Sequence, residues 1–393
     1  MDNFTFYSPT YFVFGKSTEN EVGAYVKKYG GHKVLIHYGG GSVVRSGLLD
    51  RVKASLDKEG IAHVELGGVK PNPSSGLVYE GIELCRKTGV DFVLPVGGGS
   101  VIDSAKGIAL GVPYGGDFWD FYCGKQGPVT EALPLGTIVT IAASGSEGST
   151  DSVVTLETPE GKYKRCADGD ILRPLFAIMN PELMMTLPPY QTASGITDIM
   201  AHCMERYFSD TKDCEMTDRL LEAIMLTIIK EGKRVMKDPG DYEARANIMW
   251  AAMIAQNNST GVGRAQDWGT HHLENELSTA YGCSHGAGLA ILFPSWMRYA
   301  LGVKGPEKFV KLATRVWGFQ NDFEHPDVTA NEGIDAFERF MTDIGMPTSI
   351  GAIGGKPKDA PSLAANMFHG APNHGNFVKL TPQIAEEIYR MAM

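Results

Sequence analysis

The sequence Gly-Gly-Gly-Ser-Val occurs twice in the first 101 residues, at 39–43 and at 97–101. Each copy follows an apolar run typical of a buried strand, KVLIHY at 33–38 and DFVLPV at 91–96, and each precedes a segment with helical spacing. A strand, a glycine turn and a helix in this order form the unit from which parallel sheets are built. The repeat therefore indicates an α/β fold in which helices cover both faces of a parallel sheet.

This pattern continues to about residue 186 and then changes. Apolar runs at 61–66, 135–147 and 173–181 are typical of further strands. Strand patterns then almost vanish, and amphipathic helical patterns occur at 191–208, 215–236, 241–257, 267–280, 285–301, 306–317, 331–344 and 381–392. Because a single core rarely exceeds about 300 residues, we predict an α/β domain at 1–186 and an all-α domain at 187–393, with 349–376 as a long surface connection.

Charge and composition exclude several kinds of partner. The formal net charge of -10, without a basic stripe, argues against nucleic acid or an anionic membrane as the main partner. No segment approaches the roughly 20 apolar residues of a membrane helix, and the first residues lack the basic start of a signal peptide. Six scattered cysteines without a CxxC pair suggest a reducing compartment. We therefore expect a cytoplasmic protein.

The glycine turns are candidate phosphate-binding sites. Glycine lets the backbone approach a phosphate, and the following helix offers free N–H groups. The alternative is that the glycines only form a tight structural turn. Asp103 and Lys106 follow the second turn and share one helix face. A buried Lys106 would reach a ribose or carboxamide, whereas an exposed one would form an ion pair with Asp103. In the third turn, AASGSE at 142–147, Ser144 would donate to a cofactor or cap a helix.

The first turn bears on the choice of coenzyme. Enzymes that prefer NAD usually hold an acidic residue at the end of this strand, against the ribose 2′-hydroxyl. Here the strand ends in Gly39, so no carboxylate repels a 2′-phosphate, and Arg45 adds positive charge. The turn therefore predicts NADP(H), bound by the small residues Gly39, Gly40, Gly41 and Ser42.

The second half contains a candidate metal site. Asp198 and His202 are four apart in a helical pattern, so both project from one face. His271 lies in a later helical pattern, and His285 opens the next apolar helix fourteen residues on. One carboxylate and three imidazoles suit a divalent transition metal. The spacing also fits a structural Asp–His pair and a helix-capping histidine.

Taken together, PVGGGSVIDSAK, the GSE near 145, LPP…G..D…H…E at 187–205 and H…(13)…HG at 271–286 resemble the iron-containing (group III) alcohol dehydrogenase family. YGGGSV, ARANIMWAAMIAQN and QDWGTHHLENEL are similar to its branch of NADPH-dependent butanol dehydrogenases and aldehyde reductases. The resemblance implies a Rossmann-like N-terminal domain and an all-α metal-binding domain, as in dehydroquinate synthase-like folds.

The resemblance also implies roles for individual residues. Asp198, His202, His271 and His285 would be the metal ligands. Pyrophosphate would lie on the second glycine turn, and the ribose and nicotinamide near Asp103 and Lys106. The full set of implied cofactor residues in this half of the chain is Asn72, Gly97, Gly98, Gly99, Ser100, Asp103, Lys106, Thr140, Ser144 and Lys164.

The implied activity is NADP(H)-linked interconversion of small primary alcohols and aldehydes, such as butanol and butanal. The resemblance also implies a homodimer and one divalent metal ion, with Fe²⁺ as the first candidate and Zn²⁺ or Mn²⁺ as alternatives. Many members carry a further histidine, for a proton relay, where this chain has Asn275, and a second threonine where it has Ile141. A glycerol-dehydrogenase-like polyol dehydrogenase and a metallohydrolase are the competing interpretations.

Overall fold

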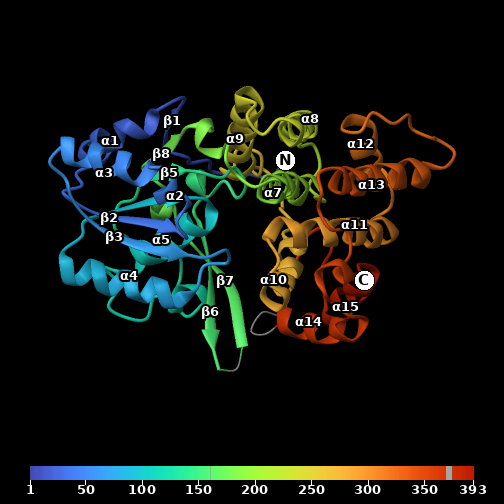
Figure 1. Cartoon of the computed structure of the whole chain (residues 1–393). Coiled ribbons are helices and arrows are strands. Elements are labelled where there is room, and N and C mark those ends of the chain that lie inside the picture. Colours follow the sequence, from blue (N-terminus) through green and yellow to red (C-terminus); the bar gives the residue numbers. More distant parts are fainter. Residues whose placement is uncertain (160, 369–373) are drawn as a thin grey trace. The chain divides into compact units, whose positions relative to one another are not determined.

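The computed structural model in Figure 1 describes residues 1–159, 161–368 and 374–393. The chain forms two compact units. We call Tyr7–Thr186 with Ala252–Asn257 the sheet unit, and Met1–Phe6, Leu187–Ala251 and Asn258–Met393 the helical unit.

Two short segments depart from the predicted division at 186/187. The first residues join the helical unit, where the Met1 ammonium donates to the Lys212 carbonyl at 2.7 Å and Asp2 N donates to Gly263 O at 2.9 Å. Residues 252–257 join the sheet unit, where Gln256 Nε2 donates to Asp151 Oδ2 at 3.4 Å. Both depend on contacts between residues far apart in the sequence.

A six-stranded sheet organises the sheet unit, in the order β1-β8-β5-β4-β2-β3 with all neighbours parallel. Its strands are β1 (Tyr11–Phe14), β2 (Lys33–Gly39), β3 (Ala62–Val69), β4 (Phe92–Gly97), β5 (Thr137–Val139) and β8 (Phe176–Met179). The helices of the unit are α1 (Val22–Lys28), α2 (Ser42–Arg45), α3 (Leu48–Lys58), α4 (Ser75–Thr88), α5 (Gly99–Gly111) and α6 (Trp119–Tyr122). The predicted parallel α/β fold is confirmed.

Alternating strand residues build a core on each face of this sheet. Leu35 and Val93 pack with α4 and α5 on one face, whereas Val34, Ile36 and Phe92 pack with α1 and α3 on the other. Side chains alternate because successive residues of a strand point to opposite faces. Figure 1 shows the strands between α4 on one side and α1 and α3 on the other.

The structure also contains strands that the sequence did not predict. β1 is an edge strand, and β6 (Asp151–Thr158) with β7 (Gly161–Asp168) forms a separate antiparallel pair. The strand expected over 135–147 is three residues long in the structure, so Thr140 and Ser144 lie in the loop that follows it. Both residues are half-buried there.

The helical unit confirms the predicted all-α part. Its helices are α7 (Pro189–Tyr207), α8 (Glu215–Lys237), most of α9 (Tyr242–Gln256), α10 (Gly269–Tyr281), α11 (His285–Lys304), α12 (Glu307–Arg315), α13 (Pro326–Asp343), α14 (Ala360–Met367) and α15 (Pro382–Met391). Most of α11 is buried because it packs against α7, α10, α13 and α15, and its last turn is exposed. Among the described residues, no helix has the length and apolar character needed to cross a membrane.

The predicted long connection over 349–376 is partly wrong. Residues 360–367 form α14, which packs against α10 and α15 and buries Leu363, Ala364 and Met367. Four of the glycines and prolines that suggested a connection precede this helix, at 351, 354, 355 and 357, and Pro361 lies in its first turn. Residues 369–373 lie outside the described part of the chain.

Candidate metal centre and cofactor site

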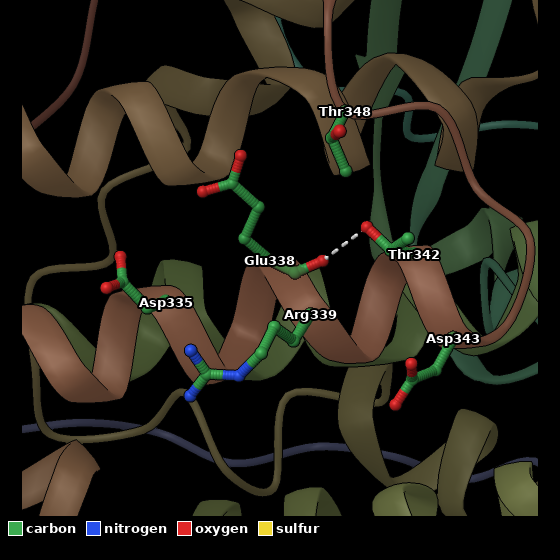
Figure 2. Close-up of a pocket in the computed structure, with 6 residues that line it drawn as sticks. All are labelled: Asp335, Glu338, Arg339, Thr342, Asp343 and Thr348. Atoms are coloured by element: carbon green, nitrogen blue, oxygen red, sulfur yellow. Dashed lines mark hydrogen bonds between the residues drawn. The ribbon is translucent and has the colours of Figure 1, made fainter.

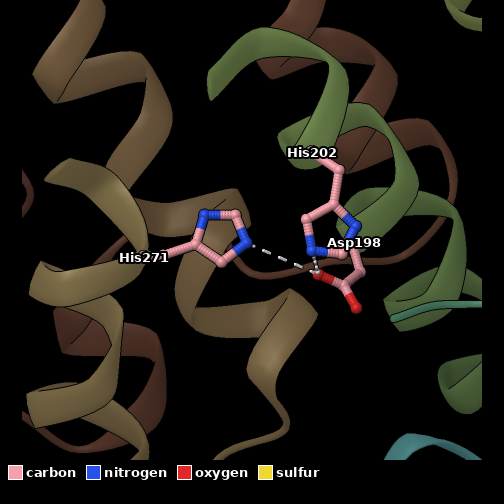
Figure 3. A group of neighbouring side chains, drawn as sticks. All are labelled: Asp198, His202 and His271. Carbon is pink, nitrogen blue, oxygen red and sulfur yellow. Dashed lines mark ion pairs between the residues drawn. The ribbon is translucent and has the colours of Figure 1, made fainter. Parts of the chain in front are cut away.

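Two helices bring the first three candidate ligands together. α7 begins with Pro189 at its first turn, where proline is tolerated, and carries Asp198 and His202 one turn apart. Both side chains are about 5% exposed. α10 contributes His271 from its first turn. The donor atoms of Asp198, His202 and His271 all lie within 4.8 Å of one another (Figure 3).

The fourth candidate, His285, reaches this group through Asp198. It is the first residue of α11, after the helix-capping Ser284, whose hydroxyl accepts from Ala287 N. Asp198 Oδ1 lies 3.6 Å from Nε2 of His202, 3.8 Å from Nε2 of His271 and 3.6 Å from Nε2 of His285. The three helices therefore direct three imidazole nitrogens at one carboxylate oxygen.

These distances fit a shared metal ion better than hydrogen bonds. They exceed the usual hydrogen-bond range, whereas tetrahedral donors about 2.1 Å from one ion are separated by about 3.4 Å. Within the described residues, Asp198 Oδ1 and His271 Nε2 are buried and have no hydrogen-bond partner. Unsatisfied buried polar atoms that converge on one point are typical of an ion site. The residues thus fit a divalent metal.

The cluster perturbs its own ionisation. Burial alone would raise the pKa of Asp198, but the three surrounding imidazoles lower it below its ordinary value. Burial lowers the pKa of His202 well below normal. Burial also opposes protonation of His271, yet the carboxylates of Asp198 and Glu205 raise its pKa to about 9. An anionic Asp198 and a neutral His202 are the forms that bind a cation.

One side of the cluster is accessible. The side chains of His271 and His285 are 13% and 28% exposed, against 5% for the other two candidate ligands. Trp268 lies beside them, and the centroids of the Trp268 and His271 rings are 5.1 Å apart. The Arg206 guanidinium lies 4.7 Å from the centroid of the Trp268 ring. The φ of Trp268, +63°, is unusual for a bulky residue.

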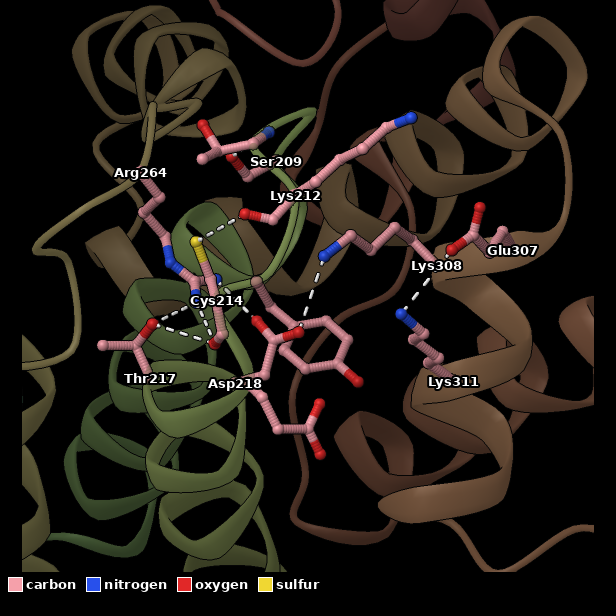
Figure 4. A network of polar contacts seen from close by, with 12 residues as sticks. Ser209, Lys212, Cys214, Thr217, Asp218, Arg264, Glu307, Lys308 and Lys311 are labelled. Carbon is pink, nitrogen blue, oxygen red and sulfur yellow. Dashed lines mark hydrogen bonds and ion pairs between the residues drawn. The ribbon is translucent and has the colours of Figure 1, made fainter. Parts of the chain in front are cut away.

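Two pockets of the helical unit lie elsewhere. One, of about 360 Å³, is lined by residues of α13 and by Thr348 (Figure 2). The other, of about 390 Å³, is lined by lysines and carboxylates, of which Lys308 lies 3.6 Å from Asp218 (Figure 4). Neither lining includes a candidate metal ligand. The chemistry of the donor set, not pocket size, identifies the site.

In the sheet unit, the two glycine turns lie side by side. β2 and β4 are neighbours, and Tyr38 pairs with Val96 just before the two turns. Thr140 N donates to Gly97 O at 3.0 Å, which joins the loop after β5 to the same edge. The carboxyl ends of these three neighbouring strands therefore meet where ligands bind in open α/β sheets.

The second turn leads directly into a helix N-terminus. Gly98 caps α5, which begins at Gly99 and runs for 13 residues. A Cβ on Gly99 would lie 2.2 Å from Ser144 Oγ, so only glycine allows the third loop to approach so closely. Ser144, Gly99 and the free N–H groups of α5 thus surround one point that suits an anion.

Lys106 and Asp103 both contact the loop between β5 and β6. Lys106 is fully buried, so the exposed ion pair is excluded. Its ammonium donates to the carbonyls of Ser146, Ser149 and Asp151 at 2.7–2.9 Å. The direct contact of Lys106 with a cofactor stays a prediction that this arrangement does not favour. Asp103 Oδ1 accepts from Ser146 Oγ at 2.7 Å, and burial raises the pKa of Asp103 to about 6.

The remaining candidates lie near the same edge. Asn72 follows β3 and has a φ of +54°. The next residue, Pro73, accepts a hydrogen bond from Thr155 N at 2.8 Å, and Thr155 pairs with the buried Lys164 across β6 and β7. Gly39 ends β2, Gly40 and Gly41 follow it, and Ser42 begins α2. Their contacts with a coenzyme stay predictions.

Sequence models of one family match almost the whole chain. The model described as iron-containing alcohol dehydrogenase matches residues 9–181, and the model of the C-terminal part of this family matches residues 192–393. The chain belongs to the iron-containing alcohol dehydrogenase family. It is therefore an oxidoreductase of the alcohol dehydrogenase class, and the family implies a divalent metal and a nicotinamide cofactor.

Three relatives of this iron-containing alcohol dehydrogenase each cover at least 91% of its length. It is 42% identical to NADH-dependent butanol dehydrogenase A of Clostridium acetobutylicum over 91% of both chains. It is 33% identical to the NADPH-dependent aldehyde reductase YqhD of Escherichia coli over 100% of both. The crystal structure of NADH-dependent butanol dehydrogenase A from Thermotoga maritima superposes with a TM-score of 0.95, at 38% identity, over 100% of this chain and 99% of that one.

Two carboxylates beside the candidate ligands were missed by sequence reasoning. Glu205 Oε1 accepts from His271 Nδ1 at 2.7 Å, and Glu274 accepts from His285 Nδ1. A repeated His-x-x-Glu pattern, HCME and HHLE, was the available signal. His272, by contrast, lies with its ring centroid 4.4 Å from that of His374.

Proposed function

We propose that the protein is a metal-dependent, NADP(H)-linked alcohol dehydrogenase and aldehyde reductase for small primary alcohols such as butanol. The observation that carries this proposal is the convergence of Asp198, His202, His271 and His285 in a member of this family. Relatives named as butanol dehydrogenases and as an aldehyde reductase support the substrate class. The family assignment disfavours a metallohydrolase.

Each group of residues has a part in the reaction. Asp198 and the three histidines would hold the metal. Fe²⁺ is the first candidate, with Zn²⁺ or Mn²⁺ as alternatives. The partly exposed side of His271 and His285 leaves room for a substrate oxygen. A bound divalent ion supplies Lewis-acid polarisation of that oxygen. The N–H groups at the start of α5 bind the pyrophosphate and so orient the nicotinamide. Asn275 does not titrate near neutral pH, so the proton reaches the product from solvent.

The coenzyme preference is proposed from the first glycine turn. The names of the relatives are divided between NADH and NADPH. Gly39 offers no carboxylate to repel a 2′-phosphate, and Arg45 Nη1 lies 3.2 Å from the position that a Cβ on Gly41 would take. An exposed cation beside an open turn favours the additional phosphate of NADP(H).

Steady-state reduction of butanal, with NADPH and with NADH, tests this function on enzyme loaded with one metal at a time. We expect a higher kcat/KM with NADPH, and loss of both bound metal and activity in His271→Ala. Full metal content and full activity in that variant would overturn the metal assignment. Glycerol in the substrate panel distinguishes a polyol dehydrogenase. Cytoplasmic location and a homodimer are part of the proposal, checked by cell fractionation and by light scattering after size exclusion.

A further inference from the structure

Two carboxylates outside the proposed ligand set contact the far nitrogens of two imidazoles. Glu205 is 1% exposed and Glu274 is fully buried. Glu205 Oε1 lies 2.7 Å from His271 Nδ1, and Glu274 Oε2 contacts His285 Nδ1. Burying a carboxylate is costly unless a hydrogen-bonding partner compensates. Their places therefore suggest a specific use for the contact with each imidazole.

The two glutamates occupy equivalent positions on two helices that carry candidate ligands, α7 and α10. Glu205 follows His202 by three residues on α7, and Glu274 follows His271 by three residues on α10. α7 supplies the partner of an imidazole on α10, and α10 supplies the partner of an imidazole on α11. α7 thus orients a candidate ligand on α10, and α10 orients one on α11.

We propose that Glu205 and Glu274 are positioning residues that set the affinity of the metal centre. By accepting from Nδ1–H, each fixes one tautomer and one ring orientation, so that Nε2 keeps its lone pair directed at the ion. This inference rests on the proposed function, because it needs Asp198, His271 and His285 to bind a metal.

Glu205 fixes the backbone of α10 as well as the ring. Its Oε1 also accepts from His271 N at 2.9 Å, one of the N–H groups that a helix start leaves without a partner. Trp268, which precedes α10, provides no side-chain cap. The carboxylate of Glu205 on α7 therefore caps this helix. It binds both the backbone N–H and the ring Nδ1 of His271, and so holds the imidazole in position against Asp198.

Gly288 gives independent support for the role of Glu274. It lies three residues after His285, on the same face of α11. A Cβ at Gly288 would lie 2.7 Å from Glu274 Cγ and 2.9 Å from Glu274 Oε1. The absence of a side chain here makes the space that Glu274 occupies, so Gly288→Ala displaces the carboxylate without removing it.

The third imidazole, His202, is oriented by ring stacking and not by a carboxylate. Among the described residues, its Nδ1 is buried without a hydrogen-bond partner. Its ring stacks on that of His271, with centroids 5.0 Å apart and planes inclined by 14°. The orientation of His202 therefore depends on His271, which Glu205 holds, so loss of Glu205 disturbs two ligands.

Zn²⁺ affinity of the full-length protein tests the inference. Wild type, Glu205→Leu, Glu274→Leu, the matching glutamine variants and Gly288→Ala would be stripped of metal and titrated with Zn²⁺ against a chromophoric chelator. Glu231→Gln is the matched control, since Glu231 is also buried but pairs with Lys230 and Arg234. Absorption after Co²⁺ substitution reports ligand geometry independently of activity.

We expect the leucine variants to bind Zn²⁺ roughly 10–100-fold more weakly than wild type. The glutamine variants should lose less, since an amide oxygen still accepts from Nδ1–H, and Glu231→Gln should match wild type. If the leucine variants and Gly288→Ala bind Zn²⁺ with wild-type affinity and show an unchanged Co²⁺ spectrum, this inference is overturned while the proposed metal centre still stands. A wild type that binds no stoichiometric metal would instead overturn the metal centre itself. If the leucine variants do not fold, Gly288→Ala decides the question for Glu274 and Glu205→Gln decides it for Glu205, where wild-type affinity and an unchanged Co²⁺ spectrum would overturn the inference.

Discussion

Lys106 Nζ donates to the carbonyl oxygen of Asp151 at 2.7 Å, although the two residues are 45 positions apart. The same ammonium donates to the carbonyls of Ser146 and Ser149, and its side chain is fully buried. Burial lowers the pKa of Lys106 to about 8. The lysine, which belongs to the helix that follows the second glycine turn, therefore fixes the loop between β5 and β6.

Lys106→Met should loosen this loop. The substitution leaves three buried carbonyls without their donor, so we expect unfolding free energy to fall by about 3 kcal/mol. Nicotinamide coenzyme should also bind more weakly, because Ser144 and its neighbours lose their support. Denaturant unfolding and fluorescence titration measure the two effects. The exposed Lys58→Met serves as control, and equal stability of the two variants would contradict this role.

Gly39→Asp should reverse the preference for coenzyme. The nearest atom to a Cβ there is Val69 O at 3.5 Å, an ordinary contact, so the variant should fold normally. Its carboxylate would repel a 2′-phosphate and accept from a 2′-hydroxyl, lowering kcat/KM for NADPH by roughly 100-fold with little loss for NADH. Kinetics with both coenzymes provide the measurement. Gly127→Asp, in open space away from the turn, should leave the ratio unchanged.

Gly99→Ala should separate the second and third loops. The new methyl group would meet Ser144 Oγ at 2.2 Å, and we expect Kd for the coenzyme to rise roughly tenfold, about 1.4 kcal/mol. Adding Ser144→Gly removes the clash and should restore part of the affinity. A double-mutant cycle with calorimetric Kd values measures this coupling, and strictly additive effects would show that the two residues do not meet.

His37 should make stability depend on pH in the acid range. Its Nδ1 donates to Leu66 O at 2.8 Å and its Nε2 accepts from Ser104 Oγ at 2.9 Å, and burial lowers its pKa from 6.5 to about 4. Between these values the unfolded chain binds a proton that the folded chain does not, so stability falls as pH falls from 6.5 to 4. The loss is up to about 3 kcal/mol.

Urea unfolding at several pH values tests this dependence. His37→Gln should lose less stability than wild type between pH 6.5 and 4, whatever its stability at neutral pH. His32→Gln is the control, because His32 is exposed and its Nδ1 lies 3.2 Å from the surface carboxylate of Asp91. Parallel pH profiles for wild type and His37→Gln would contradict the prediction.

Features carried by local spacing could be predicted from the sequence. The strand and helix around each glycine turn, and the pairs on single helices such as Asp198 and His202, follow from periodicity. The short edge strand β1 and the polar hairpin of β6 and β7 could not, because their stability depends on partners elsewhere in the chain. α14 was hidden by its surroundings, since its short apolar segment stands among glycines and prolines.

Long-range contacts explain the remaining differences at the site. The local sequence around Lys106 does not indicate that its hydrogen-bond acceptors lie 40–45 residues downstream. Likewise, the partner of His271 is Glu205, 66 positions away on another helix. Sequence spacing can identify groups able to bind a metal or a phosphate, whereas the groups that hold them in place are chosen by tertiary packing.

The adjacency of β2 and β4 has an evolutionary consequence. The two glycine turns are built by different segments. In the proposed cofactor site one turn binds the pyrophosphate and the other distinguishes the two coenzymes, so point changes at residues 39–42 would alter the electron donor while the neighbouring turn keeps its geometry. A lineage could exchange biosynthetic for catabolic reducing equivalents in a few steps, without rebuilding the rest of the enzyme.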